Sequence, residues 1–202
     1  MKKVFGFSLA LLLLAGCAVK EVPPTISYTL AAETPAIERS TKAPLFKTLR
    51  VVVKHDSRLS ATKNIYYLEK GFALQPYAYH CWYDTPASLL EKKLQLALSK
   101  AGIARSVTDS TTPIPSDAML YVEVAELWQD FSHGTPSRAV VTLQATLKTR
   151  KGEVLTRLFS ASVKTKSDDA PGGVAAFNEA MDRLMGEIAA WLISEGRVSS
   201  EK

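Results

Sequence analysis

Side chains that could carry nucleophilic or metal chemistry are few in this 202-residue chain. It has two cysteines, Cys17 and Cys81, and three histidines, His55, His80 and His133. No two histidines have metal-ligand spacing and no Cys-x-x-Cys occurs, so no metal site is predicted. His80 and Cys81 are adjacent, but neighbouring residues of a strand point to opposite faces, which argues against a Cys/His catalytic pair. We therefore expect no catalytic residue, metal ligand or cofactor site.

A second group of candidates stands before the last predicted helix. Gly172 and Gly173 could offer backbone amides to an anion, but no lysine or hydroxyl follows at the spacing of a phosphate-binding loop. A hinge or helix-start signal is the favoured interpretation. Asp168 and Asp169 suit the start of that helix better than acid/base chemistry, because negative charge is stabilised there.

Cys17 has the most specific context. An apolar run of 12 residues, 4–15, follows two lysines. A membrane-spanning helix needs about 20 apolar residues, so this run is typical of a secretory signal. The four residues Leu14-Ala15-Gly16-Cys17 resemble the lipobox of bacterial lipoproteins. That resemblance implies a thioether-linked lipid on the Cys17 sulfur and cleavage after Gly16.

These residues predict the order of segments along the chain. We expect a signal peptide at 1–16, a lipidated tether at 17–25, a single domain at 26–195 and a C-terminal tail at 196–202. Ala18 would follow the lipidated cysteine, and by the same resemblance a residue other than Asp there favours the periplasmic face of the outer membrane. Two or more acyl chains hold a protein stably on a bilayer.

Charge and cysteine content limit the remaining choices. The net charge is +5, and loss of Lys2 and Lys3 leaves 23 basic against 20 acidic residues, or +3. This charge is small and scattered, so no nucleic-acid partner is expected. With Cys17 lipidated, Cys81 has no partner for an internal disulfide, and the fold must depend on its core.

The apolar patterns predict strands, a helix, more strands and a second helix. Alternation over 138–149 is typical of a strand with one buried face, and it joins the strands 118–131 and 153–165 in an antiparallel meander. Helices are predicted over about 86–101 and from about 170 onward, each with an apolar stripe. Shorter strands are expected at 25–30 and 49–54, and a hairpin at 65–69 and 72–79. The predicted class is α+β, a mainly antiparallel sheet with two long helices packed on one face.

Aromatic residues are concentrated between 66 and 83. A well-packed hairpin would explain them, because aromatic residues favour strands. Tyrosine and tryptophan are also enriched at protein interfaces. From this group Tyr77, Tyr79, Trp82 and Tyr83 are the candidate partner-contact residues.

The order of several short motifs resembles the ABC-type transport auxiliary lipoprotein family, also called the paraquat-inducible protein C type. The motifs are the lipobox, Y-x-L at 28–30, R-V at 50–51, I-x-Y at 65–67, the aromatic element at 77–82, L-x-x-x-L at 90–94, A-F-N-x-A at 176–180 and W-L at 191–192. Cys81 directly before Trp82 departs from the family pattern.

The resemblance implies a non-enzymatic auxiliary subunit of an ABC system that moves lipids or other hydrophobic molecules across the periplasm. Its implied partner is a periplasmic protein with MCE (mammalian cell entry) domains, and association with copies of itself is left open. Two alternatives remain: a stand-alone lipid carrier with an apolar cavity between sheet and helices, and an enzyme acting on envelope polymers.

Overall fold

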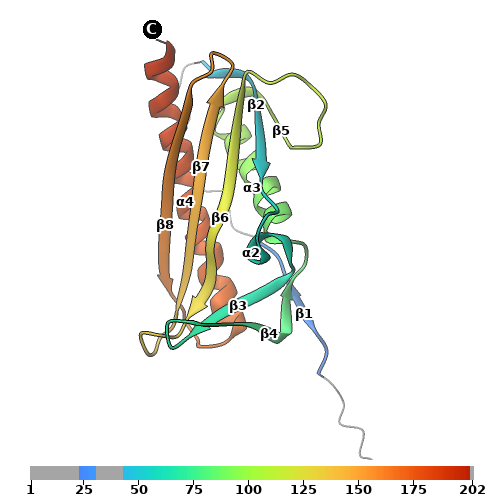
Figure 1. The fold of residues 1–202 in the computed structure, drawn as a ribbon, viewed down its shortest axis with the longest axis vertical. Helices are drawn as coiled ribbons and strands as arrows, with labels where there is room; N and C mark the ends of the chain where they lie inside the picture. The colour runs from blue at the N-terminus through green and yellow to red at the C-terminus, as the bar shows by residue number, and fades with distance from the viewer. Residues whose placement is uncertain (1–22, 31–42, 201–202) are drawn as a thin grey trace, which may run out of the picture.

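The computed structural model describes residues 23–30 and 43–200, with the side chains of 197–200 excepted. Cys17 and the predicted signal peptide lie outside the described residues, so their assignments stay predictions. In these described ranges eight strands form one mixed sheet (Figure 1). They are β1 (Ile26–Tyr28), β2 (Phe46–Val53), β3 (Asn64–Glu69), β4 (Ala73–Trp82), β5 (Ala104–Thr108), β6 (Ala118–Asp130), β7 (Arg138–Thr149) and β8 (Val154–Lys164).

The predicted meander is confirmed. β6 pairs antiparallel with β7 and β7 with β8 over nearly their whole lengths. The other edge of β6 is shared, because β2 lies parallel to its first half and β3 parallel to its last two residues. The long antiparallel ladders make the sheet mainly antiparallel, as expected, although β1, β2 and β5 pair only in parallel.

Two long helices cover one face of the sheet, which confirms the predicted class (Figure 1). Helix α3 (Pro86–Lys100) packs on β2 and β5, and α4 (Ala170–Ser200) packs on β7 and β8. Thr85 caps α3 by accepting a hydrogen bond from the Ser88 amide at 3.3 Å, and Pro86 occupies the first turn, where no N–H is needed. Gly102 ends the helix with a φ of 67°.

The core lies between this sheet face and the two helices. It includes the alternating residues of β7 and the apolar stripe of each helix, as the sequence predicted. Members that are fully buried include Leu90, Leu94, Leu143, Phe177 and Met181. Burial of such side chains is worth about 1.5–3 kcal/mol each, so this layer holds the helices on the sheet.

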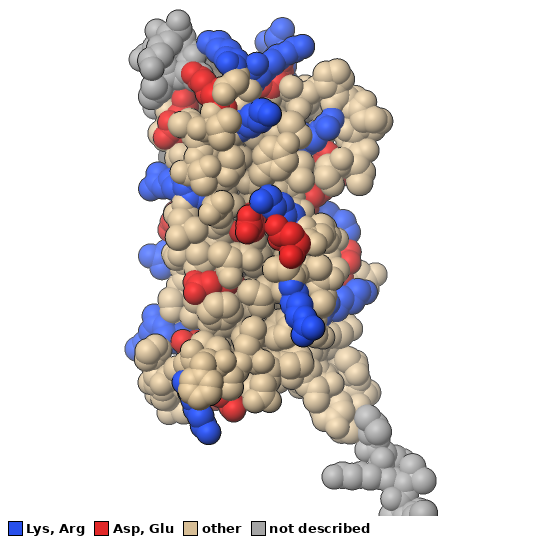
Figure 2. All heavy atoms as spheres, in the orientation of Figure 1, with Lys and Arg blue, Asp and Glu red and all other residues tan. Residues whose placement is uncertain are grey.

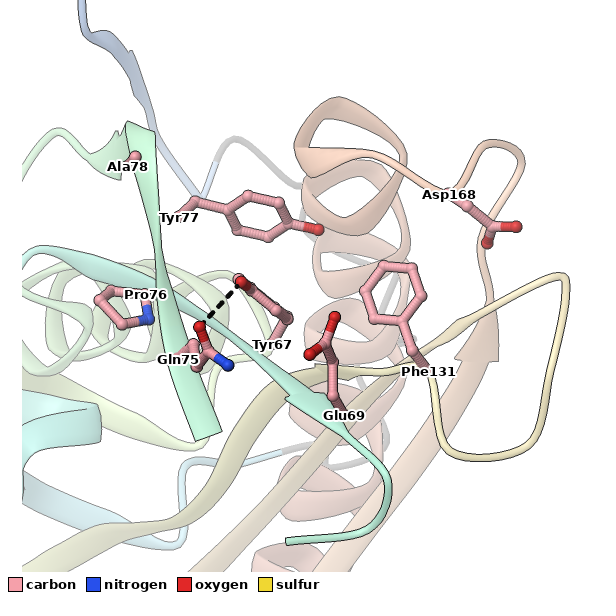
Figure 3. Close-up of a pocket in the computed structure, with 8 residues that line it drawn as sticks. All are labelled: Tyr67, Glu69, Gln75, Pro76, Tyr77, Ala78, Phe131 and Asp168. Atoms are coloured by element: carbon pink, nitrogen blue, oxygen red, sulfur yellow. Dashed lines mark hydrogen bonds between the residues drawn. The ribbon is translucent and has the colours of Figure 1, made fainter. Parts of the chain in front are cut away.

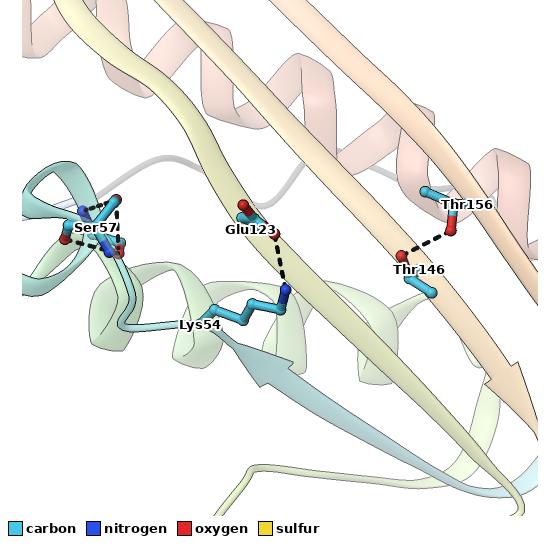
Figure 4. Close-up of polar contacts among 6 residues, drawn as sticks. Lys54, Ser57, Glu123, Thr146 and Thr156 are labelled. Atoms are coloured by element: carbon cyan, nitrogen blue, oxygen red, sulfur yellow. Dashed lines mark hydrogen bonds and ion pairs between the residues drawn. The ribbon is translucent and has the colours of Figure 1, made fainter.

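Among the described residues no helix covers the opposite face of β6, β7 and β8, and most of its surface is uncharged (Figure 1, Figure 2). Polar pairs join the strands there (Figure 4). The Lys54 ammonium lies 2.9 Å from the Glu123 carboxylate, and the hydroxyls of Thr146 and Thr156 are 3.0 Å apart. Between β2 and β3, Ser57 forms a capping box with Ser60 at the start of the short helix α2 (Arg58–Ala61).

Three features were not anticipated. Strand β5 and helix α2 are additional elements, and α4 continues to Ser200, five residues beyond the predicted domain end. Within the described ranges no helix has the length and apolar character to cross a bilayer.

Candidate functional site

Three of the candidate partner-contact residues lie on β4 and Tyr83 directly follows it; β4 crosses one end of the molecule as a hairpin with β3 (Figure 1). The ladder pairs Tyr66 with Pro76 but Asn64 with Cys81. Four residues of β4, 77–80, therefore stand opposite the single residue Ile65. This bulge shifts the inward and outward positions of β4. Pro76, which has no N–H to donate to a ladder, lies where the bulge begins.

The bulge separates the candidate residues. Tyr79, within the bulge, and Tyr83, directly after the strand, are 41% and 70% exposed. Trp82 is only 1% exposed, and its ring packs against Phe177 of α4 with centroids 5.8 Å apart. The structure contradicts the expectation of a partner contact at Trp82, because the bulge turns this side chain into the core.

Tyr77 lies between these extremes and lines a hollow of about 450 Å³ (Figure 3). Its ring lies 4.8 Å from that of Tyr67, and the Tyr67 ring meets that of Phe131 edge-on at 6.1 Å. The carboxylates of Glu69 and Asp168 stand at the rim. The hollow thus offers aromatic surface and negative charge together, which suits an apolar or basic side chain of a partner.

A buried polar network supports the hollow from behind. The Tyr77 hydroxyl donates to Gln129 Oε1 at 2.8 Å, and Gln129 Nε2 donates to the Ser137 hydroxyl at 2.8 Å. The Ser137 and Thr165 hydroxyls are also 2.8 Å apart. Burial, together with the negative charge of Asp169, raises the pKa of Tyr77 to about 12. The network joins β4 to the ends of β6, β7 and β8.

The start of α4 is part of the same junction. The Ser137 amide donates to the Asp168 carboxylate at 2.6 Å, and the Gly172 amide donates to Asp169 at 2.8 Å. The hydrogen bond from the Ser137 amide lowers the pKa of Asp168. The pKa of Asp169 is lowered most by the Ser167 hydroxyl and next by the Gly172 amide. Asp169 caps the start of α4 as expected, whereas Asp168 binds the Ser137 amide and the Thr165 hydroxyl instead of a helix amide.

The two glycines there allow close packing. A Cβ at Gly173 would lie 2.2 Å from Gln129 Oε1, and one at Gly172 would lie 2.1 Å from the Ser167 carbonyl oxygen. These distances are shorter than any allowed contact, so glycine is needed at both positions. The pair is a packing feature of the helix start.

The histidines and Cys81 have separate surroundings. His80 Nδ1 lies 2.9 Å from the Tyr28 hydroxyl, and Cys81 Sγ lies 3.4 Å from the Ser27 hydroxyl. His133 is on the β6–β7 connection near Asp130, whereas His55 lines a different hollow beside Glu91 and Asp109. Over residues 23–30 and 43–200, no three acidic, histidine or cysteine side chains gather as metal ligands would.

Sequence reasoning did not identify Gln129, Ser137 and Thr165. All three are polar yet buried, with at most 5% exposure. Gln129 occupies an inward position on the otherwise apolar face of β6. A polar residue at such a position indicates a buried hydrogen-bond network, and this was the signal available in the sequence.

Comparison with known proteins gives one family. The sequence profile of the ABC-type transport auxiliary lipoprotein component matches residues 28–189. No curated protein sequence matches the chain.

Two solved structures have a similar fold. The protein XCC0632 from Xanthomonas campestris, of family DUF330, has a TM-score of 0.70 at 20% identity, with 89% of this chain and 98% of that chain covered. An uncharacterized protein has a TM-score of 0.65 at 15% identity, with 84% and 99% covered. At these identities the likeness shows the fold alone.

Proposed function

The chain belongs to the ABC-type transport auxiliary lipoprotein family, and we propose that it is the non-enzymatic docking subunit of a lipid-moving ABC system. In this proposal acyl chains on Cys17 hold it at the periplasmic face of the outer membrane. Its folded domain binds the periplasmic MCE-domain protein of that system. The family match over residues 28–189 is the observation that carries the proposal.

The filled core favours docking over lipid carriage. A carrier would need an apolar cavity between the sheet and the two helices. Large side chains from the sheet and from both helices fill that space, among them Leu120 of β6, Leu94 of α3 and Met181 of α4, each with 0% exposure. Opening that space for an acyl chain would require these side chains to separate. Separation costs a free energy of about 25 cal/mol for each Å² of apolar surface exposed.

The exposed tyrosines supply the proposed contact. Tyr79 of β4 and Tyr83 directly after it present exposed rings with polar tips, and tyrosine is enriched at the centres of interfaces. Tyr77 is held by Gln129 in the wall of the adjoining hollow, which is proposed to receive a side chain of the partner. An interface that combines anchoring rings and a recess is typical of specific binding.

Capture of the partner tests the proposal. The lipidated full chain is immobilised in detergent and presented with a periplasmic MCE-domain protein from its native host. The double variant Tyr79→Ala, Tyr83→Ala is expected to weaken capture at least about tenfold, since such anchors are worth about 2 kcal/mol or more. Leu158→Ala, on the uncovered face of β8, is the control and should capture normally.

Two outcomes would contradict the proposal at different levels. If the tyrosine variant captures as well as the control, the contact lies on another surface. If the unsubstituted chain captures no MCE-domain protein, the proposed partnership is wrong. Mass spectrometry of the protein from its native host tests the anchor separately, because an unmodified thiol at Cys17 would contradict it.

A further inference from the structure

The turn between β3 and β4 displays an aromatic ring. Phe72 is 81% exposed, although burying a phenylalanine side chain is worth about 1.5–3 kcal/mol. Lys70 and Gly71 have φ values of 54° and 77°, and the Phe72 amide donates to the Glu69 carbonyl at 3.2 Å. Positive φ at both central residues is the geometry of a tight hairpin turn, and Phe72 is the residue that directly follows them.

The tip is fixed to the body of the protein. The Gly71 amide donates to the Ser132 hydroxyl at 2.7 Å, and the Ser132 amide in turn donates to the Asp130 carboxylate at 2.7 Å. The ring of Phe72 is therefore presented outward by an ordered turn.

The neighbours of Phe72 have the character of a membrane-interface segment. Lys70 is exposed beside it, and Leu74 is 42% exposed two residues farther along β4. A lysine with aromatic and aliphatic side chains suits the boundary between headgroups and acyl chains, where the ammonium stays in water and the apolar groups enter the lipid.

The position of the hairpin agrees with such a contact. The described chain begins near β1, which pairs with β4 at the end of the molecule that the hairpin crosses (Figure 1). Eight residues lie between Cys17 and Ile26, and the nine Cα–Cα steps from one to the other span at most about 32 Å. Phe72 is eight residues from His80, the partner of Ile26, which is at most about 26 Å along a strand.

The opposite end of the molecule is beyond this reach. Helix α4 starts at the hairpin, where Asp168 and Tyr77 line one hollow, and runs away from it for 31 residues. At 1.5 Å per residue its far end is about 46 Å distant. A chain anchored through Cys17 thus has the hairpin end next to the bilayer.

We propose that the β3–β4 hairpin is a second membrane contact, in which Phe72 enters the headgroup–acyl boundary of the bilayer that holds the anchor, with Lys70 at the headgroups. This proposal rests on the lipidation of Cys17 in the proposed function. It fixes the domain end-on, with α4 directed away from the membrane.

A depth measurement tests this orientation. The full lipidated chain carrying Phe72→Trp is reconstituted into vesicles of phosphatidylethanolamine and phosphatidylglycerol, with or without lipid brominated near the headgroup end of its acyl chains. Leu158→Trp is the matched control, because Leu158 is 59% exposed and six residues, about 20 Å, from the end of β8 nearest the hairpin. The emission of the unsubstituted chain is subtracted, which removes the native tryptophans.

The added emission of Phe72→Trp should shift to shorter wavelength and lose most of its intensity with brominated lipid, while that of Leu158→Trp should do neither. If the chain floats with the vesicles but Phe72→Trp is quenched no more than Leu158→Trp, the hairpin contact is overturned and the anchor stands. If both are quenched equally, the end-on orientation is overturned. If the chain does not float, the anchor on which both proposals depend is overturned.

Discussion

Replacing Gly173 by alanine places a methyl group where α4 meets the buried amide of Gln129. The new Cβ would lie 2.2 Å from Gln129 Oε1 and 2.8 Å from its Cδ. Gln129 is fully buried and holds the hydroxyls of Tyr77 and Ser137, each at 2.8 Å. Its side chain therefore has to move, and both hydrogen bonds are expected to break.

Two opposing effects decide the result. Glycine to alanine within a helix normally stabilises a protein by about 0.5–1 kcal/mol. Each buried polar group left without a partner costs about 1–3 kcal/mol. With two bonds lost at about 2 kcal/mol each, Gly173→Ala is expected to lower the free energy of unfolding by about 3 kcal/mol. The local contact thus outweighs helix propensity.

Urea unfolding followed by circular dichroism measures this difference on the chain without residues 1–17. Gly186→Ala is the control in the same helix, because no heavy atom lies within 4 Å of a Cβ built there, and it should raise stability. In a Gln129→Ala background, where the obstructing amide is gone, Gly173→Ala should cost little. Equal stabilisation by Gly173→Ala and Gly186→Ala would refute the reasoning.

Three further predictions concern burial and charge. The Lys93 ammonium is 6% exposed and lies 3.1 Å from the Asp182 carboxylate, so Asp182→Ala leaves it without its counter-charge and should lower the free energy of unfolding in urea by about 2–3 kcal/mol. The double variant Asp182→Leu, Lys93→Met should recover most of that loss, and an equal loss in both variants would contradict this. Trp82→Ala should cost about 4 kcal/mol, as expected for a buried aromatic residue, and a loss below about 1 kcal/mol would mean that Trp82 is not in the core. Hydrogen bonds from Ser167 and Gly172 hold the pKa of Asp169 below its usual value, so its contribution to folding stability is present above about pH 4 and is lost as pH falls through the folded-state pKa. Asp169→Asn, which still caps the helix, should show a smaller fall of the urea midpoint in acid, and an unchanged fall would contradict the role given to Asp169.

Much of the fold follows from periodicity. The alternation in β7 and the apolar stripes of α3 and α4 specify which side of each element is buried, and the short turns between β6, β7 and β8 specify antiparallel neighbours. Thr85, Pro86 and Gly102 mark the ends of α3 by their conformational preferences. Each of these signals comes from residues that are close together in the chain, so it can be read from the sequence without knowing the fold.

The parallel pairs were not predictable in the same way. A strand pattern states which face is buried but not which strand lies alongside, and the neighbours of β2 come from segments more than 50 residues later in the chain. Strand β5 has only Ala104 and Val107 as apolar residues, too few for a clear period. Apart from Pro76, no residue pattern in the sequence marks the β4 bulge. The bulge places the Trp82 side chain in the core, where the sequence predicted a partner contact.

That bulge connects the structure to the proposed activity. Without it, strict alternation would place Tyr77, Tyr79 and Tyr83 on one face and Trp82 on the other. With it, Tyr77 reaches inward to Gln129, while Tyr79 and Tyr83 stay exposed and Trp82 packs on α4. Tyr79 therefore stands on a strand that is held to the core on both sides of it, and Tyr83 directly follows the buried Trp82. Rings held in this way lose little conformational freedom when a partner binds, which favours affinity.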